Sequence, residues 1–239
     1  MTIFCTRCVM PSTKPDLTFD SEGVCSACSA FNRRQEIDWD SRREELSRLL
    51  EGIKSKGDWD CVVPVSGGKD STYQVLIALQ MGLKPLAVTA TTCDLSAIGR
   101  RNLTNISRLG VDHIEWTTSD PVRRKLNRLM LERTGDISWP EHLAIFTVPV
   151  KIAASLSIPL ILWGENSQNE YGGPLASQEK PHLDRDWLEE FGGLLGQRLS
   201  DLVDEGALTE REAAYFRYPS DESLKAANVS GVFLGHFLP

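Results

Sequence analysis

A glycine-rich segment between an apolar run and a helical stretch constrains this chain more than any other feature. The run Cys61–Val65 has the composition of a buried strand, the segment Ser66–Ser71 has the sequence SGGKDS, and Thr72–Met81 has helical character. A turn between a strand and a helix directs backbone N–H groups and the positive end of the helix dipole at an anion. Glycines permit positive φ and close backbone approach, and serine and lysine side chains add donors. We therefore predict a phosphate-binding loop.

The segment differs from a Walker loop, because the pattern G-x-x-x-x-G-K-[ST] needs a glycine five residues before Gly68 and Val63 stands there. It resembles instead the SGGxDS loop of the ATP pyrophosphatase (PP-loop) superfamily, whose members cleave ATP to AMP and pyrophosphate. The resemblance implies adenylation of a substrate oxygen, followed by displacement of AMP by a nucleophile. The alternative is an ordinary strand–turn–helix junction that is rich in glycine.

Four cysteines near the N-terminus form a second motif. They are arranged as two C-x-x-C pairs separated by sixteen residues, namely Cys5, Cys8, Cys25 and Cys28. This spacing is typical of a tetrathiolate zinc site, and four thiolates leave no position for a catalytic water. We predict structural zinc, with a redox dithiol, an iron–sulfur cluster or disulfides as alternatives. Of the two remaining cysteines, Cys61 is expected in the core. Cys93 follows the end of an expected strand, near the expected nucleotide, where a catalytic thiol is an alternative role.

Composition places the chain among soluble globular proteins. It has 239 residues, 41% hydrophobic and 25% charged, with a net charge of -7 at pH 7. No apolar run reaches the ~18 residues of a membrane span, and the N-terminus shows no signal peptide. We therefore expect a cytoplasmic protein without membrane contact, and the negative charge disfavours nucleic acid as a partner. The apolar C-terminal segment stops abruptly, which leads us to expect truncation of a longer protein.

Strand-like and helical segments alternate, which predicts a parallel twisted α/β sheet with right-handed crossovers. Strands are expected at 60–65, 84–90, 111–116, 158–163 and 232–237, and helices at 39–56, 72–81, 98–109, 120–133 and 141–156. From about 174 the rhythm changes, with a polar helical stretch over 184–203 and a short capped helix from Thr209. The expected organisation is a zinc-binding segment (1–35), a connecting helix (36–58) and a nucleotide-binding domain (59–239). Ligands bind at the carboxyl ends of such strands, where the loops 66–71, 89–94 and 164–173 should converge.

The whole chain resembles one branch of the superfamily, the N-acetyl sugar amidotransferases. The match is carried by Cys5–Pro11, Gly23–Cys28, Val63–Gln74, Trp139–His142 and Trp163–Asn166 with Glu170–Gly173. This resemblance implies the adenine nucleotide alpha hydrolase-like (PP-loop, Rossmann-like) fold. It also implies conversion of an acetamido group on a nucleotide-linked sugar or nonulosonic acid into an acetamidino group, in lipopolysaccharide, O-antigen, pseudaminic or legionaminic acid biosynthesis. Because the chain shows no convincing glutaminase of its own, ammonia is expected from a glutaminase partner.

The resemblance also implies roles for particular residues. Lys69, Asp70 and Glu165 are the expected catalytic residues, and Asp70 the expected Mg²⁺ ligand. ATP and pyrophosphate are expected to contact Ser66, Gly67, Gly68, Lys69, Asp70, Ser71, Thr89, Ala90, Thr91 and Gly164. The expected substrate contacts are Glu165, Asn166, Glu170, Tyr171, Trp139 and His142. For the loop residues among these, a solvent-exposed polar loop is the alternative. For Trp139 and His142, a core tryptophan and a helix-start histidine are equally compatible with the sequence.

Three other functions remain open on the sequence. A tRNA-thiolating PP-loop enzyme also combines cysteine pairs with an SGGxDS loop, but it needs a persulfide or cluster site and a basic RNA surface. A non-catalytic, zinc-stabilised nucleotide-binding scaffold is the second alternative, which the intact loop disfavours. Ligation of ammonia to a carboxylate, as in NAD synthesis, is the third, and the cysteine pairs do not suit it.

Overall fold

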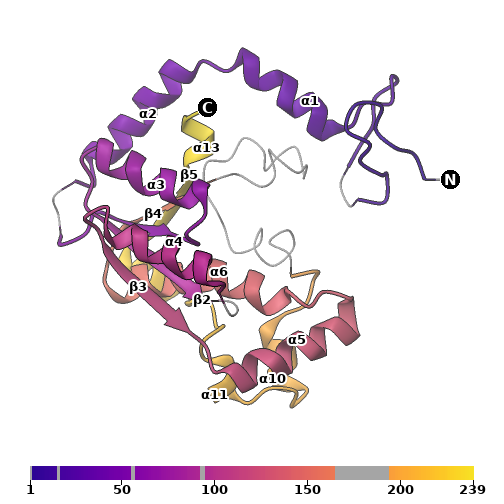
Figure 1. Ribbon diagram of the computed structural model, residues 1–239, viewed down its shortest axis with the longest axis vertical. Coiled ribbons are helices and arrows are strands. Elements are labelled where there is room, and N and C mark those ends of the chain that lie inside the picture. The colour runs from indigo at the N-terminus through magenta and orange to yellow at the C-terminus, as the bar shows by residue number, and fades with distance from the viewer. Residues whose placement is uncertain (1, 15–16, 55–56, 92–94, 165–193) are drawn as a thin grey trace. The chain divides into compact units, whose positions relative to one another are not determined.

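The computed structural model describes residues 2–14, 17–54, 57–91, 95–164 and 194–239 (Figure 1). They divide into two compact units. The first contains the described residues up to Glu51 together with Gly164 and Phe233–Pro239. The second contains the described residues from Gly52 to Trp163 and from Leu194 to Val232.

A five-stranded sheet forms the centre of the second unit, in the order β3-β2-β1-β4-β5. Its strands are β1 (Cys61–Pro64), β2 (Pro85–Thr91), β3 (Asp112–Thr117), β4 (Leu160–Trp163) and β5 (Ser230–Phe233). The pairs β1–β2, β1–β4 and β2–β3 are parallel, which confirms the predicted parallel α/β architecture. This strand order is that of doubly wound nucleotide-binding sheets. Since β1 is central, its apolar residues are buried on both faces, as its uninterrupted apolar sequence predicts.

The helices that connect the strands cover the two faces of the sheet. They are α3 (Lys69–Gln80), α4 (Ala97–Ser107), α5 (Asp120–Thr134) and α6 (Trp139–Ser155). The chain moves outward from β1 through β2 to β3, and then returns past β1 to β4. Right-handed crossovers therefore place α3 and α4 on one face and α6 on the other. α3 packs against β1 and β2, and α6 packs against β1, β2 and β4 (Figure 1).

The reversal of direction creates a switch point between β1 and β4. In open α/β sheets a crevice opens there, outside the carboxyl ends of the strands, and ligands bind in it. The SGGKDS loop follows β1 directly, so it lies at this crevice. The topology thus brings the predicted phosphate-binding loop to the position where such sheets bind nucleotides.

The C-terminal part of the second unit consists of short helices. They are α10 (Leu199–Asp204), α11 (Glu210–Ala213) and α12 (Asp221–Ala227). A capping box between Thr209 and Glu212 begins α11, at the capped start that the sequence predicts. Of the helical stretch expected over 184–203, residues 184–193 lie outside the described residues, and α10 covers part of the remainder. α12 was not predicted.

The first unit contains the N-terminal and C-terminal helices. They are α1 (Ser26–Arg33), a 3-10 turn (Arg34–Glu36), α2 (Trp39–Glu51) and α13 (Leu234–Phe237). α13 packs against α2, and the Arg42 guanidinium donates to the backbone carbonyl of His236 over 2.8 Å. The prediction of one strand over 232–237 was therefore wrong, because the strand ends at Phe233 and the chain continues as α13. No helix in the described part of the chain combines the length and the apolar character that a membrane span requires.

Candidate functional site

The turn after β1 depends on the absence of a side chain at Gly67. Gly67 has φ +78°, and a Cβ there would lie 2.9 Å from the backbone nitrogen of Leu103 on α4. Gly68 differs, since its φ is -75° and it serves as the N-cap residue of α3. Of the two glycines expected to supply positive φ, only Gly67 does so. Gly68 instead is the N-cap residue of α3, the helix whose first N–H groups are the predicted anion donors.

A Gly67→Ala substitution is therefore expected to destabilise the second unit, because it adds both backbone strain and a backbone clash. Gly110→Ala is the matched control, since Gly110 has φ +86° and a Cβ there would meet no atom within 4 Å. The control should cost about 1–2 kcal/mol from strain alone. Gly67→Ala should cost about 2 kcal/mol more in urea unfolding. Equal losses of stability in the two variants would show that α4 moves to accommodate the added methyl group.

Hydroxyl groups at both ends of the loop hold its shape. The Ser71 hydroxyl accepts a hydrogen bond from the Ser66 N–H at 3.2 Å and donates to the Gly68 carbonyl at 3.2 Å. The Thr72 hydroxyl donates to the same carbonyl over 2.9 Å. The Ser66 hydroxyl lies 3.5 Å from that of Ser71 and accepts from the Gly68 N–H. Ser71 is buried, so its hydroxyl has a structural role: its hydrogen bonds hold the backbone of the loop in place.

Lys69 and Asp70 stand at the exposed mouth of the loop. The Lys69 ammonium lies 2.6 Å from an Asp70 carboxylate oxygen, and the two side chains are 89% and 75% exposed. A pair this exposed contributes little to folding stability. Both groups face solvent. An ammonium can neutralise phosphate oxygens, and a carboxylate is an oxygen ligand of the kind that Mg²⁺ prefers.

Thr89 has a structural role that its predicted contact with ATP does not describe. Its hydroxyl donates to the Val65 carbonyl over 2.7 Å and lies 2.9 Å from His113 Nε2. Because the hydroxyl proton is used on Val65, the Thr89 oxygen accepts and His113 carries its proton on Nε2. Burial lowers the pKa of His113, which keeps the ring neutral at pH 7. Thr89 and His113 thus fix the end of β1 from which the loop starts.

Thr91 ends β2 and differs from Thr89 in its hydrogen bonding. Side chains two apart on a strand share a face, so Thr91 follows Thr89 toward the carboxyl edge. Its hydroxyl oxygen is buried and has no hydrogen-bond partner in the described part of the chain. Ala90 is buried. An unpaired buried hydroxyl is costly, so Thr91 is a candidate for contact with a ligand at the carboxyl end of β2.

The remaining predicted residues are placed differently. Trp139 begins α6, is fully buried and donates from Nε1 to the Leu194 carbonyl at 2.9 Å, which favours the core tryptophan over a substrate wall. His142 is partly exposed, with Nδ1 3.6 Å from an Asp136 carboxylate oxygen. The Gly164 carbonyl accepts from the Gly235 N–H at 2.8 Å. The other residues lie outside the described residues, namely Cys93, Glu165, Asn166, Glu170 and Tyr171.

Cys61, the fifth described cysteine, lies in the core as predicted. It is fully buried at the start of β1, between Pro85 on β2 and Leu160 on β4. Burial raises the pKa of its thiol. A buried, protonated thiol is a poor nucleophile, so Cys61 behaves as a small apolar residue.

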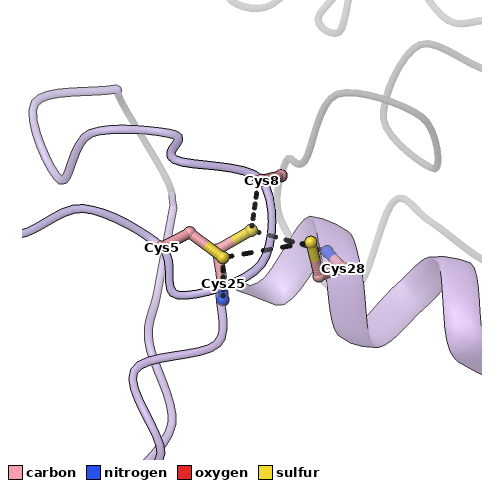
Figure 2. Close-up of side chains that lie close together, drawn as sticks. All are labelled: Cys5, Cys8, Cys25 and Cys28. Atoms are coloured by element: carbon pink, nitrogen blue, oxygen red, sulfur yellow. Dashed lines mark hydrogen bonds between the residues drawn. The ribbon is translucent and has the colours of Figure 1, made fainter.

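The four N-terminal cysteines converge on one point in the first unit (Figure 2). Their sulfur atoms all lie within 4.8 Å of one another. Sγ of Cys5 is 3.9 Å from that of Cys28, and Sγ of Cys8 is 3.5 Å from that of Cys25. Zinc–sulfur bonds of about 2.3 Å in a tetrahedron require sulfurs about 3.8 Å apart. All four thiols are free, so the set fits a tetrathiolate metal ion.

Backbone groups prepare this cluster for a metal. The N–H groups of Arg7 and Cys25 donate to Sγ of Cys5 at 3.4 and 3.3 Å. Burial opposes the thiolate of Cys5, but hydrogen bonds from the backbone outweigh it and lower the pKa of Cys5 to about 6. Burial raises the pKa of Cys28 to about 12 and also raises that of Cys25. Metal binding must therefore release protons from these two thiols.

No protein-family model and no curated sequence matches this chain. Among solved structures, NH3-dependent NAD synthetase from Campylobacter jejuni is similar over 80% of this chain and 92% of its own, with a TM-score of 0.41 and 10% identity. NMN synthetase from Francisella tularensis is similar over 84% of this chain and 93% of its own, with a TM-score of 0.39 and 14% identity. Likenesses this distant assign no activity to this chain.

Proposed function

We propose that this protein is an ATP-dependent amidotransferase of the PP-loop type, which converts the acetamido group of a sugar into an acetamidino group. The observation that carries the proposal is the position of the SGGKDS loop, at the carboxyl end of β1 and at the switch point of the sheet. The sugar substrate comes from the resemblance of the sequence to the N-acetyl sugar amidotransferases.

The reaction proceeds in two steps. An amide is a poor electrophile, because its nitrogen lone pair is delocalised into the carbonyl. In the first step the amide oxygen attacks the α-phosphorus of ATP, the new O–P bond forms, and pyrophosphate leaves as the bond to the β-phosphate breaks. In the second step ammonia attacks the carbon of the resulting imidate, a proton is lost, and AMP departs with the oxygen. The products are the acetamidine, AMP and pyrophosphate.

The described residues supply electrostatic stabilisation for the first step. The N–H groups at the start of α3 and the Lys69 ammonium face the charge that develops on the β- and γ-phosphates. Asp70 would hold Mg²⁺, which would neutralise further phosphate charge. Ser66 and Ser71 keep the loop in its binding conformation through their hydrogen bonds. Thr91 supplies a donor for the nucleotide through its unpartnered hydroxyl.

Ammonia comes from a separate glutaminase in this proposal, because the sequence shows no convincing glutaminase nucleophile. Purified protein should then use ammonium directly and should use glutamine poorly until the partner is added. Efficient use of glutamine by the purified chain would overturn this part of the proposal.

The deciding experiment measures pyrophosphate release from ATP and Mg²⁺ with ammonium, against UDP- and CMP-linked acetamido sugars. We expect release that depends on one sugar, and a product about one mass unit lighter than that sugar, because O is replaced by NH. Release that depends on tRNA would favour the thiolation alternative instead. Release with neither, from protein that binds ATP, would favour the non-catalytic scaffold.

Two threonines on β2 allow a matched test of nucleotide binding. Thr91→Val removes a buried hydroxyl that has no protein partner among the described residues, so stability should change little while ATP affinity falls about fivefold to tenfold. Thr89→Val removes the hydrogen bonds to Val65 and His113 and should cost about 1–3 kcal/mol of stability. Urea unfolding and calorimetric ATP titration of both variants measure the two effects. An unchanged ATP affinity in Thr91→Val would remove this residue from the nucleotide site.

A further inference from the structure

A cavity of about 450 Å³ lies in the second unit, beside α10. Its walls come from the N-terminal half of α6, the segment that leads into α10, α10 itself and the segment after α11. The volume falls in the range of small-molecule sites. None of the described residues that line the cavity belongs to the SGGKDS loop or takes part in the reaction proposed above. The lining includes Leu143, Leu194, Phe216, Gln197, Asp204 and Arg217.

The cavity lies at the carboxyl edge of the sheet. The C-terminus of α6 leads into the start of β4 at the amino edge, so the N-terminal half of α6, with Leu143, lies toward the carboxyl edge. The Tyr215 hydroxyl donates to the carbonyl of Trp116, near the end of β3, over 2.8 Å. Phe216, the next residue, lines the cavity. The cavity wall is therefore anchored at the carboxyl end of β3.

The cavity and the expected ATP contacts belong to opposite faces of the sheet. Thr89 of β2 is in register with Glu115 of β3, and neighbours in register share a face. Glu115 pairs with Arg100 of α4, so Thr89, and Thr91 two residues later, face α4. Trp116 points to the other face, where a lysine of α6 contacts its ring. Because α6 also forms part of the cavity wall, a ligand in the cavity does not compete with ATP for space.

The lining suits a planar ring with a polar edge. Leu143, Leu194 and Phe216 are buried and provide an apolar surface, whereas Gln197 and Asp204 retain solvent exposure. A nucleobase has apolar faces that pack against such side chains, and its edge carries hydrogen-bond donors and acceptors. A wholly apolar ligand would leave the two polar side chains without partners.

The polar groups also match a pyrimidine nucleoside. The Gln197 amide offers both a donor and an acceptor, which complement O4 and N3–H of uracil or, after rotation, N3 and the amino group of cytosine. The Asp204 carboxylate can accept from the two hydroxyls of a ribose. Arg217 is paired with Glu210, which also lines the cavity, so these two charges offset each other. The cavity therefore suits the neutral nucleoside better than the phosphates.

We propose that this cavity binds the pyrimidine nucleoside of a nucleotide-linked acetamido sugar, with Gln197 at the base and Asp204 at the ribose. This inference rests on the proposed function and adds to it the residues that recognise the carrier nucleotide. The sugar, which carries the group that reacts, stays outside the cavity.

The linkage between nucleoside and sugar accounts for the separation of the two sites. β3 and β1 are separated only by β2, and two strand spacings amount to about 10 Å. In a nucleotide-linked sugar the ribose and the phosphates stand between the base and the sugar. With the nucleoside in the cavity, these groups extend along the carboxyl edge and bring the acetamido group toward the loop after β1.

The test is calorimetric titration of UDP and of CMP into the full chain, with the ATP site saturated by α,β-methylene-ATP. The cavity variants are Gln197→Leu and Asp204→Ala, and the matched control is Asp201→Ala, on the same helix as Asp204 but outside the cavity. We expect at least one of the two nucleotides to bind, with affinity about tenfold lower in each cavity variant and unchanged in the control. Affinity for α,β-methylene-ATP and the melting temperature should be the same in all four proteins.

Three results would overturn the inference. The nucleotides could bind the wild-type chain and both cavity variants equally, they could bind only when α,β-methylene-ATP is absent, which would place them in the ATP site, or they could fail to bind. The proposed function is decided separately, by sugar-dependent pyrophosphate release from the wild-type chain. Release that depends on a nucleotide-linked sugar, together with any of these three results, would leave the proposed function standing without this subsite.

Discussion

Lys69→Ala should reduce pyrophosphate release from ATP by about 100-fold to 1000-fold, the usual effect of removing one donor that stabilises transition-state charge. The substitution removes the ammonium and also leaves the Asp70 carboxylate, 2.6 Å away, without its counter-charge. An uncompensated carboxylate beside a triphosphate repels it. The loss should therefore appear in ATP affinity as well as in the rate. The fold should be unaffected, because the Lys69 side chain is 89% exposed.

Lys225→Ala is the control, since Lys225 is also an exposed helical lysine and lies on α12 in the same unit. Steady-state pyrophosphate release and thermal unfolding should be measured on both variants beside the wild-type chain. Normal release by Lys69→Ala would remove the lysine from the mechanism. A large fall in melting temperature for Lys69→Ala would show that the loop is structural rather than catalytic.

The order of strands and helices along the chain was largely predictable. Apolar runs bounded by turn residues mark β1, β2 and β4, polar–apolar alternation marks β3, and helical spacing marks α3 to α6. The structure at the end of the chain was not predictable, because the apolar run Val232–Phe237 has no periodicity that distinguishes a strand from a buried helix. The structure resolves this through contacts distant in sequence: α13 packs against α2, and His236 accepts from Arg42.

The parts of the candidate site that depend on local sequence were predictable. The contacts that depend on the register between parallel strands were not predictable. The loop and the cysteine cluster follow from spacing, and the cysteine sulfurs converge as expected. The role of Thr89 depends on the parallel register, which places its hydroxyl at the Val65 carbonyl and its oxygen at His113. The polar–apolar alternation of β3 marks it as a strand, but nothing in that pattern identifies the partner of His113.

Zinc removal should unfold the N-terminal segment and leave the second unit folded. Among the described residues from 2 to 36, only Cys5, Val24 and Cys25 are buried, so this segment has almost no apolar core of its own. Metal binding supplies about 10–16 kcal/mol to small zinc modules, far more than the hydrogen bonds within the segment provide. Chelation followed by hydrogen exchange should show loss of protection in this segment while β1 to β4 stay protected.

Cys25→Ser should unfold the N-terminal segment as chelation does. Its effect should be larger than that of substituting a cysteine ligand that is exposed. Cys25 is fully buried, its N–H donates to Sγ of Cys5, and its sulfur accepts from the Cys28 N–H at the start of α1. The substitution therefore removes a metal ligand at a fully buried position, while serine keeps an acceptor for the N-cap of α1. Cys61→Ala is the control and should retain one zinc per chain by elemental analysis. If Cys25→Ser retained full zinc, Cys25 would not be a required ligand. If the chelated segment stayed protected, the segment would be stabilised by its own hydrogen bonds rather than by a metal ion.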